Sequence, residues 1–118
     1  MASVEIQQYE TAEGDVPFDG RLASIRDGKA VARITAAIVK MQSGLFGDWK
    51  AVGGGVLETR IDYGPGYRIY YGKDGDKLVI LLVCGDKRSQ SKDIEVANDY
   101  WQDYKARKQA VQPGQPPA

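Results

Sequence analysis

The stretch RIDYGPGYRIYY, from Arg60 to Tyr71, predicts two short β-strands joined by a tight turn. The Tyr-Gly-Pro-Gly segment at residues 63–66 favours the turn, and the isoleucine- and tyrosine-rich segments on either side favour strands. Two arginines, Arg60 and Arg68, lie among these apolar residues. Because side chains alternate between the two faces of a strand, we expect both arginines on one outer face of neighbouring antiparallel strands, opposite the face that meets the core.

The residues before this hairpin predict one strand and two helices. Alternating apolar residues indicate a strand over about Ser3–Tyr9. Asp15 is expected to cap a first helix that has Pro17 in its first turn. A second helix is expected over Lys29–Gln42 and should end at Gly44. Because the turn between the two helices is short, they should form an antiparallel hairpin.

The residues around and after the hairpin complete the pattern. The glycine-rich segment Gly44–Gly55 is expected to be a flexible connection. The expected strands are Val56–Asp62, Tyr67–Tyr71 and Lys77–Cys84. The last of these is apolar almost throughout, which is typical of a strand buried on both faces. A final helix should begin near Ser89–Ser91. Its expected core stripe consists of Ile94, Ala97, Trp101 and Tyr104.

The predicted order is therefore β-α-α-β-β-β-α. This order is typical of an α+β domain with a mostly antiparallel sheet, an N-terminal helical hairpin and a C-terminal helix. A chain of 118 residues is long enough for one such domain, which we expect over residues 1–110. The last residues, 111–118, are rich in proline and glycine, and we expect them to be a disordered tail.

The composition indicates an ordinary globular protein. Hydrophobic residues make up 42% of the chain and charged residues 27%. No apolar run approaches the roughly 20 residues that a membrane helix needs. The first residues, MASVEIQQYE, lack the basic start and the apolar run of a signal peptide. The single cysteine excludes an internal disulfide. We therefore expect a cytoplasmic protein that does not bind a membrane.

The formal net charge is zero, but the charges are unevenly distributed along the chain. Residues 1–28 contain six acidic and two basic residues, a net charge of −4, whereas residues 29–118 contain ten acidic and fourteen basic residues, a net charge of +4. The later part of the chain could therefore present a local basic surface. Ordinary solvated surface charge is the alternative explanation.

The two arginines of the hairpin suit a phosphate ligand. A guanidinium is planar and permanently charged, and it can hold a phosphate through two parallel hydrogen bonds. Lys87 and Arg88 follow the buried strand and are expected at the rim of the same face. The alternative is that the arginines pair with Glu58 and Asp62 on a solvated sheet face, where each pair would contribute little.

Other candidate residues are expected to be structural. Cys84, at the end of a buried strand, is predicted to be a small core residue. Trp49 is predicted to pack in the core, with exposure for base stacking as the alternative. The glycines at 53–55 lack the ending of a phosphate-binding loop, which favours a linker. The chain has no histidine, and no cluster of Cys or carboxylates has metal-ligand spacing, so we expect neither a metal nor a cofactor.

Three segments also resemble a known family. ETRIDYGPGYRIYY at residues 58–71, LLVCGDKRSQSKDI at residues 81–94 and FGDWKAVGGGV at residues 46–56 are similar to the addiction-module killer proteins. These proteins are a branch of the RelE/ParE-type toxins of bacterial type II toxin–antitoxin modules. The similarity covers roughly residues 30–104. It implies the RelE-like fold, in which two helices pack on a twisted antiparallel sheet that is followed by a C-terminal helix.

The resemblance implies a toxin that cuts ribosome-bound mRNA without a metal or small-molecule cofactor and so inhibits translation. In this reaction the ribose 2′-OH attacks the adjacent phosphate and leaves a 2′,3′-cyclic phosphate and a 5′-OH. The implied partners are the ribosome, mRNA and a cognate helix-turn-helix antitoxin. The hairpin positions of the family fall on Arg60 and Arg68, and its basic position after the last strand falls on Lys87 or Arg88; the expected catalytic residues are Arg60, Arg68 and Lys87. The expected RNA-binding residues are Lys50, Tyr70, Arg88 and Lys92.

The sequence departs from the family pattern at the acid and base of this reaction. Several relatives use a histidine or a C-terminal tyrosine, whereas this chain has no histidine and has Ile94 near the tyrosine position. Arg60 stays protonated and cannot serve as a base. The candidates are Lys50, Lys87, Tyr70 and Glu58. The alternative function is a non-nuclease binding protein of the same fold, such as a gyrase-poisoning toxin or an inactive copy.

Overall fold

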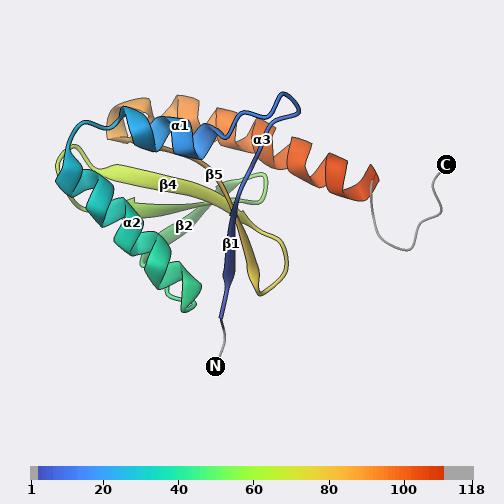
Figure 1. Ribbon diagram of the computed structural model, residues 1–118, viewed down its shortest axis with the longest axis horizontal. Coiled ribbons are helices and arrows are strands. Elements are labelled where there is room, and N and C mark those ends of the chain that lie inside the picture. Colours follow the sequence, from blue (N-terminus) through green and yellow to red (C-terminus); the bar gives the residue numbers. More distant parts are fainter. Residues whose placement is uncertain (1–2, 111–118) are drawn as a thin grey trace.

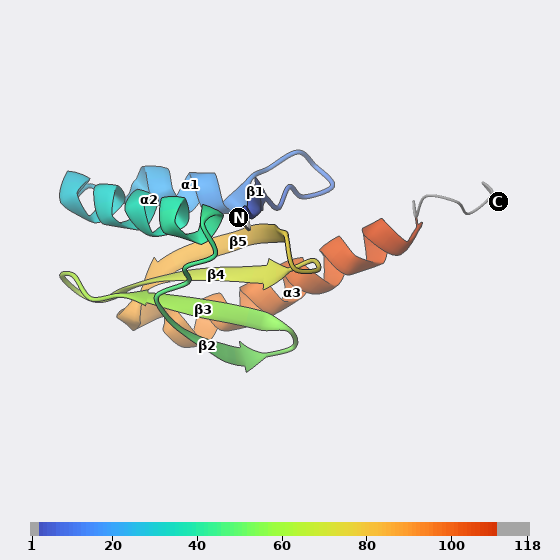
Figure 2. The same ribbon diagram turned by 90° about the horizontal axis from the view of Figure 1, so that it is seen from below.

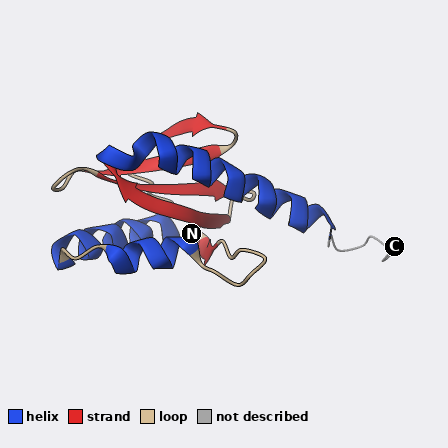
Figure 3. Ribbon diagram, turned by 90° about the horizontal axis from the view of Figure 1, so that it is seen from above, coloured by secondary structure: helices blue, strands red, loops and turns tan. Residues whose placement is uncertain are grey.

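A five-stranded sheet lies between two layers of helices in the computed structural model, which describes residues 3–110 (Figures 1 and 3). The tail expected at residues 111–118 lies outside the described residues. The elements are β1 (Glu5–Gln8), α1 (Pro17–Ser24), α2 (Gly28–Gln42), β2 (Asp48–Gly53), β3 (Val56–Ile61), β4 (Tyr67–Lys73), β5 (Leu78–Asp86), the 3₁₀ helix η1 (Lys87–Ser89) and α3 (Gln90–Ala110). The expected α+β class with a C-terminal helix is confirmed.

The sheet is mostly antiparallel, as expected. Its strand order is β1-β5-β4-β3-β2, and Figure 2 shows β5, β4, β3 and β2 following one another in this order. β1 pairs with β5 in parallel, and the three remaining pairs are antiparallel. Within residues 3–110, no helix is both long and apolar enough to cross a membrane.

The expected element order was wrong at one point, because the segment predicted as a flexible connection contains β2. This strand pairs with β3, and a tight turn at Gly54 and Gly55 joins the two. Both glycines have positive φ angles, 67° and 90°, which side chains other than glycine rarely adopt. The glycines therefore form a hairpin turn rather than a linker, and β2 is one of the two edge strands of the sheet.

The helix ends follow local rules that the sequence contains. The side chain of Asp27 caps α2 by accepting hydrogen bonds from the N–H groups of Lys29 and Ala30, at 2.9 and 3.4 Å. At the other end of α2, Gly44 has a φ of 82°, and its N–H bonds to the carbonyl of Met41. The N–H of Leu45 bonds to the carbonyl of Lys40, which completes a Schellman motif. The predicted stop of this helix at Gly44 is confirmed.

The expected cap of the first helix was wrong. Val16 occupies the N-cap of α1 and makes no side-chain cap bond, and Pro17 follows it. Asp15 is held in the preceding loop, where its N–H donates to the hydroxyl of Thr11 at 3.1 Å and its carbonyl accepts from the N–H of Thr11 at 2.8 Å. Proline fixes a φ angle suited to the first helical position, so α1 starts without a polar cap.

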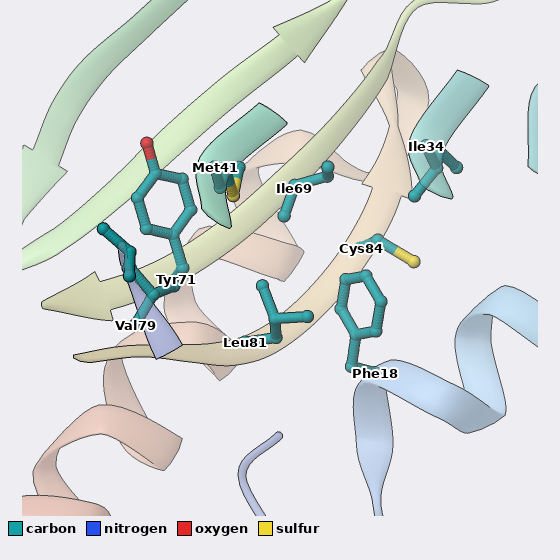
Figure 4. Packing of buried hydrophobic residues seen from close by; sticks show 9 residues of the cluster. Phe18, Ile34, Met41, Ile69, Tyr71, Val79, Leu81 and Cys84 are labelled. Atoms are coloured by element: carbon teal, nitrogen blue, oxygen red, sulfur yellow. The ribbon is translucent and has the colours of Figure 1, made fainter. Parts of the chain in front are cut away.

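The first core lies between the sheet and the helices α1 and α2 (Figure 4). Its buried members are Val4, Phe18, Ile34, Met41, Ile69, Tyr71, Val79, Leu81 and Cys84, and Figure 4 labels all of them except Val4. The predicted core position of Cys84 is confirmed, because this side chain is 1% exposed.

The predicted core position of Trp49 was wrong, because this side chain is 56% exposed on β2. An edge strand has no neighbour on its outer side, so a large side chain there has less to pack against.

The second core lies between the opposite face of the sheet and α3. Its members are Tyr9, Val56, Tyr70, Ile80, Leu82, Val83, Ala97 and Trp101. The predicted apolar stripe of the last helix packs here, which confirms that expectation.

Two strand glycines allow the helix to approach closely. A Cβ atom at Gly72 would lie 2.5 Å from the ring of Trp101, and one at Gly85 would lie 1.9 Å from Asp93 Oδ2. Such distances are too short for non-bonded atoms, so α3 packs directly on the backbone of β4 and β5.

We predict that Gly72→Ala destabilises the protein by about 1–3 kcal/mol, because the new methyl group overlaps a buried indole that already stacks on Tyr104. The matched control is Gly20→Ala in α1, where an added Cβ meets nothing within 4 Å. This change should be neutral or stabilise by up to about 1 kcal/mol, since alanine favours helix. Urea unfolding of both variants measures the difference. Equal stability of the two variants would contradict direct packing of α3 on β4.

We also predict that Cys84 resists alkylation in the folded protein. Burial is the main cause that raises the pKa of its thiol to about 12, so almost no thiolate forms near pH 8. Iodoacetamide should therefore react slowly with the native chain and rapidly in urea, and mass spectrometry should detect a single adduct because the chain has one cysteine. Equal rates in buffer and in urea would show that this part of the core is open.

Candidate functional site

The three residues expected to be catalytic line one cleft of about 520 Å³. Arg60 of β3 and Arg68 of β4 are direct partners across the antiparallel pair. Lys87 enters from η1, and the turn at residues 64–66 closes one side of the cleft. The alternation of side chains in the hairpin therefore places both arginines together, as the sequence predicts. Asp48 and Asp62 also line the cleft, so three basic side chains meet two acidic ones.

The two arginines differ in exposure, which the sequence did not predict. Arg60 is 49% exposed at its side chain, and its Nη1 atom is 4.0 Å from Asp48 Oδ2. Arg68 is 5% exposed, because α3 covers this face of the sheet. The expectation of two arginines on an exposed outer face was therefore wrong for Arg68. The cleft combines one available guanidinium with one that the fold holds in place.

A buried carboxylate positions Arg68. Glu58 is 1% exposed, and its Oε2 atom is 3.6 Å from Arg68 Nε. Gln90 of α3 donates from Nε2 to the same oxygen at 3.1 Å, and Lys50 Nζ lies 3.9 Å from Oε1. Arg68 also donates from Nη1 to the carbonyl of Gly66 at 3.1 Å. These contacts fix the direction of the guanidinium and occupy Glu58, which makes this carboxylate a positioning group and a poor candidate for a general base.

Tyr70 was expected to contact RNA but lies inside the protein. It is fully buried beneath α3, and its hydroxyl has no hydrogen-bond partner within residues 3–110. Burial, followed by the nearby charge of Glu58, raises the pKa of this hydroxyl far above its usual range. The ring is therefore not accessible to an RNA base in this structure, and the hydroxyl is a neutral group at any physiological pH.

The other expected RNA-binding residues do not line the first cleft. Lys50, on β2, is 60% exposed and lies beside Glu58 of the neighbouring strand β3. Arg88 is 84% exposed, and its guanidinium donates to Asp86 Oδ2 from Nε at 3.3 Å and from Nη2 at 2.9 Å. It lines a separate cleft together with Arg21 and Arg26. Lys92 is exposed in the first turn of α3.

Sequence analysis missed a second charge pair, in which the carboxylate is buried and the arginine is partly exposed. Asp93 of α3 is fully buried against Gly85, and Ser89 donates to its Oδ2 atom at 2.5 Å. Arg21 of α1 lies 2.9 Å from Asp93 Oδ1 and donates from Nη1 to the carbonyl of Cys84 at 2.9 Å. The hydrogen bond that Arg21 donates to Asp93 is the main cause that raises the pKa of Arg21. The spacing of Ser89 and Asp93, four residues apart, was the available signal, whereas nothing local pointed to Arg21.

The described residues contain no group of three or more His, Cys, Asp or Glu side chains that could hold a metal ion. The first cleft offers one fixed guanidinium, Arg68, one half-exposed guanidinium, Arg60, and the ammonium group of Lys87. Such a cleft can bind a phosphate and stabilise added negative charge on it.

The comparisons with known proteins identify one informative relative. A Haemophilus influenzae protein named "Uncharacterized protein" is 48% identical to this chain over 80 residues, which cover 68% of this chain and 81% of that protein. No family model matches the chain.

We predict that Arg68→Ala destabilises the protein by about 3 kcal/mol, because it leaves Glu58 as a buried and poorly compensated charge. Arg60→Ala should cost less than about 1 kcal/mol, since Arg60 is half-exposed and its carboxylate partner is distant. Denaturant unfolding of both variants tests this difference.

The double variant Glu58→Gln/Arg68→Ala serves as the control for this explanation. It should be more stable than Arg68→Ala alone, because a neutral amide replaces the uncompensated carboxylate. If the double variant is no more stable than Arg68→Ala, the loss of stability does not come from the buried charge.

Proposed function

The chain belongs to the same family as this uncharacterized Haemophilus influenzae protein, and from the cleft described above we propose that it is the toxin of a type II toxin–antitoxin module that cuts ribosome-bound mRNA. The observation that supports this proposal most directly is the meeting of Arg60, Arg68 and Lys87 in one cleft. The proposal includes the RelE-like fold type, with α1 and α2 as its helical hairpin, and a cytoplasmic location.

The proposed reaction is the attack of a ribose 2′-oxygen on the adjacent phosphorus. The 2′-hydroxyl loses its proton, the bond from phosphorus to the 5′-oxygen breaks, and the 5′-oxygen takes up a proton. The products are a 2′,3′-cyclic phosphate and a 5′-hydroxyl. Negative charge increases on the phosphate oxygens during the attack, and cationic donors that are already in place stabilise it most effectively.

The residues of the cleft suit different parts of this task. Arg68 is held by Glu58 and Gly66, so it can contact a phosphate oxygen without losing much conformational freedom. Arg60 is half-exposed and can close on the phosphate from the opposite strand. Lys87 is an exposed ammonium group at the same cleft and is the cleft residue that can give a proton to the leaving oxygen.

The proposed partners are the ribosome with its mRNA and a cognate helix-turn-helix antitoxin. Arg60 and Lys87 are accessible cations, and an acidic segment of an antitoxin could neutralise them. Complementary charge would increase the rate of capture and favour the correct partner.

The second candidate function is a non-nuclease binding protein of the same fold, such as a gyrase poison. The observation that favours it is the absence of histidine from the chain. Histidine is the side chain whose ordinary pKa suits proton transfer near neutral pH. A toxin that acts by binding alone does not need such a group.

We predict that induction of the native protein alone in a bacterium stops growth and that Arg60→Ala relieves the arrest. Loss of one cationic donor that stabilises the charge of the transition state commonly lowers a rate by about 10²-fold or more. Primer extension on cellular mRNA should show new in-frame 5′ ends with the native protein and few with the variant. Arg60 is the suitable position because its loss should leave the fold intact.

Lys77→Ala is the matched control, since Lys77 is an exposed cation in the turn between β4 and β5, outside the cleft. It should remain fully toxic. Arrest with intact mRNA and double-strand DNA breaks would support the gyrase alternative. Full toxicity of Arg60→Ala with unchanged mRNA cleavage would place the active face elsewhere.

A further inference from the structure

A second cleft, of about 330 Å³, lies where η1 approaches α1. Arg21, Arg26 and Arg88 line it, and Asp86 is its one acidic lining residue. The first cleft has three basic and two acidic lining residues, so the second cleft has the larger surplus of positive charge. In a chain whose net charge is zero, such a local surplus favours an anionic ligand.

Two of the three arginines in this cleft are held by carboxylates. Arg21 contacts the buried Asp93 at 2.9 Å and the carbonyl of Cys84. Arg88 is held by Asp86 through two donors. Fixed guanidinium groups lose little freedom when they bind a ligand, which favours binding.

Arg26 differs from the other two, because it is exposed and forms no ion pair with any residue in the range 3–110. Its guanidinium is therefore fully available to a ligand. Ser24 and Ser89 also line the cleft, but each hydroxyl already donates its proton within the protein, to the carbonyl of Arg21 and to Asp93 Oδ2, so the arginines are the donors left for an anion.

The two clefts meet at the end of the sheet where β4 begins and β5 ends. Neighbouring residues alternate between them: Arg68 lines the first cleft and Tyr67 the second, and Lys87 lines the first and Arg88 the second. The backbones of β4 and β5 pair at this end, with Arg68 opposite Gly85 and Tyr67 opposite Asp86. Because chain neighbours line the two clefts, we expect one nucleic acid strand to be able to contact both.

We propose that this second cleft binds a phosphate of the RNA strand that flanks the phosphate held between Arg60 and Arg68. This inference rests on the proposed function, and it assigns Arg21 and Arg26 to RNA binding. RNA is favoured over an acidic protein segment because the cleft is small and polar, contains three planar guanidinium groups and directly adjoins the first cleft.

The test measures binding of single-stranded RNA by fluorescence anisotropy at several salt concentrations. All RNAs carry 2′-O-methyl groups so that they are not cut. A dinucleotide reaches only the first cleft, whereas a hexanucleotide can reach both. Arg26→Ala should weaken hexanucleotide binding by about 3- to 10-fold at low salt and reduce the salt slope by about 0.7, the contribution of one phosphate contact in a single strand. Dinucleotide binding should stay unchanged.

Two variants provide controls. Arg60→Ala should weaken binding of both RNAs, because it removes a contact in the first cleft. Lys77→Ala removes an exposed cation outside both clefts and should affect neither. Circular dichroism of each variant verifies that it is folded.

Three outcomes would overturn the proposal. If Arg26→Ala leaves hexanucleotide affinity and salt slope unchanged while Arg60→Ala weakens both RNAs, the second cleft does not bind RNA but the proposed function stands. If inorganic phosphate binds the native protein through Arg26 and RNA length has no effect, the cleft is a site for free anions. If neither RNA binds the native protein, the second cleft does not bind RNA, and the proposed function is decided separately by the in-frame cleavage of ribosome-bound mRNA in cells.

Discussion

The burial of charged side chains beneath α3 is the constraint on which the rest of the structure depends. Glu58, Arg68 and Asp93 are all at most 5% exposed, and an unpaired charge at such a depth would be very costly. Glu58 and Arg68 pair with each other, and Asp93 pairs with Arg21. Distant elements contribute to both pairs, because Arg21 comes from α1 and Gln90 of α3 donates a hydrogen bond to Glu58. The position of α3 on the sheet and the direction of the arginine in the first cleft are therefore determined together.

This arrangement explains how a chain without net charge can present cationic clefts. Around the clefts, Glu58 and Asp93 are buried and Asp86 pairs with Arg88, so these three carboxylates are already occupied. The arginines of these pairs, Arg68, Arg21 and Arg88, line the two clefts. Arg60 and Arg26 are the exceptions, because both are exposed and weakly held or unpaired within residues 3–110. In the two proposals, Arg60 and Arg26 make contacts that form only when RNA binds, whereas Arg68, Arg21 and Arg88 are already held in place by carboxylates.

Local signals in the sequence accounted for most of the fold. The cap at Asp27, the stop at Gly44 and the apolar stripe on the last helix all match the structure, because each depends on residues within one or two turns. The edge strand β2 was missed because it is short, has mainly exposed side chains and lies between glycines. Trp49 was misplaced for the same reason: burial of a side chain depends on its neighbours in space, and an edge strand has few of them.

The sequence by itself determined that Arg60 and Arg68 lie side by side, since the alternation of a strand and the turn of a hairpin are local properties. Only the tertiary structure decided that α3 covers Arg68 and leaves Arg60 half-exposed. It also decided that Arg21 and Arg26, the two basic residues of an acidic N-terminal segment, lie beside Arg88. The physical reason is that exposure and the partners of a charge depend on which distant element packs on a face, and no periodicity within a single element contains that information.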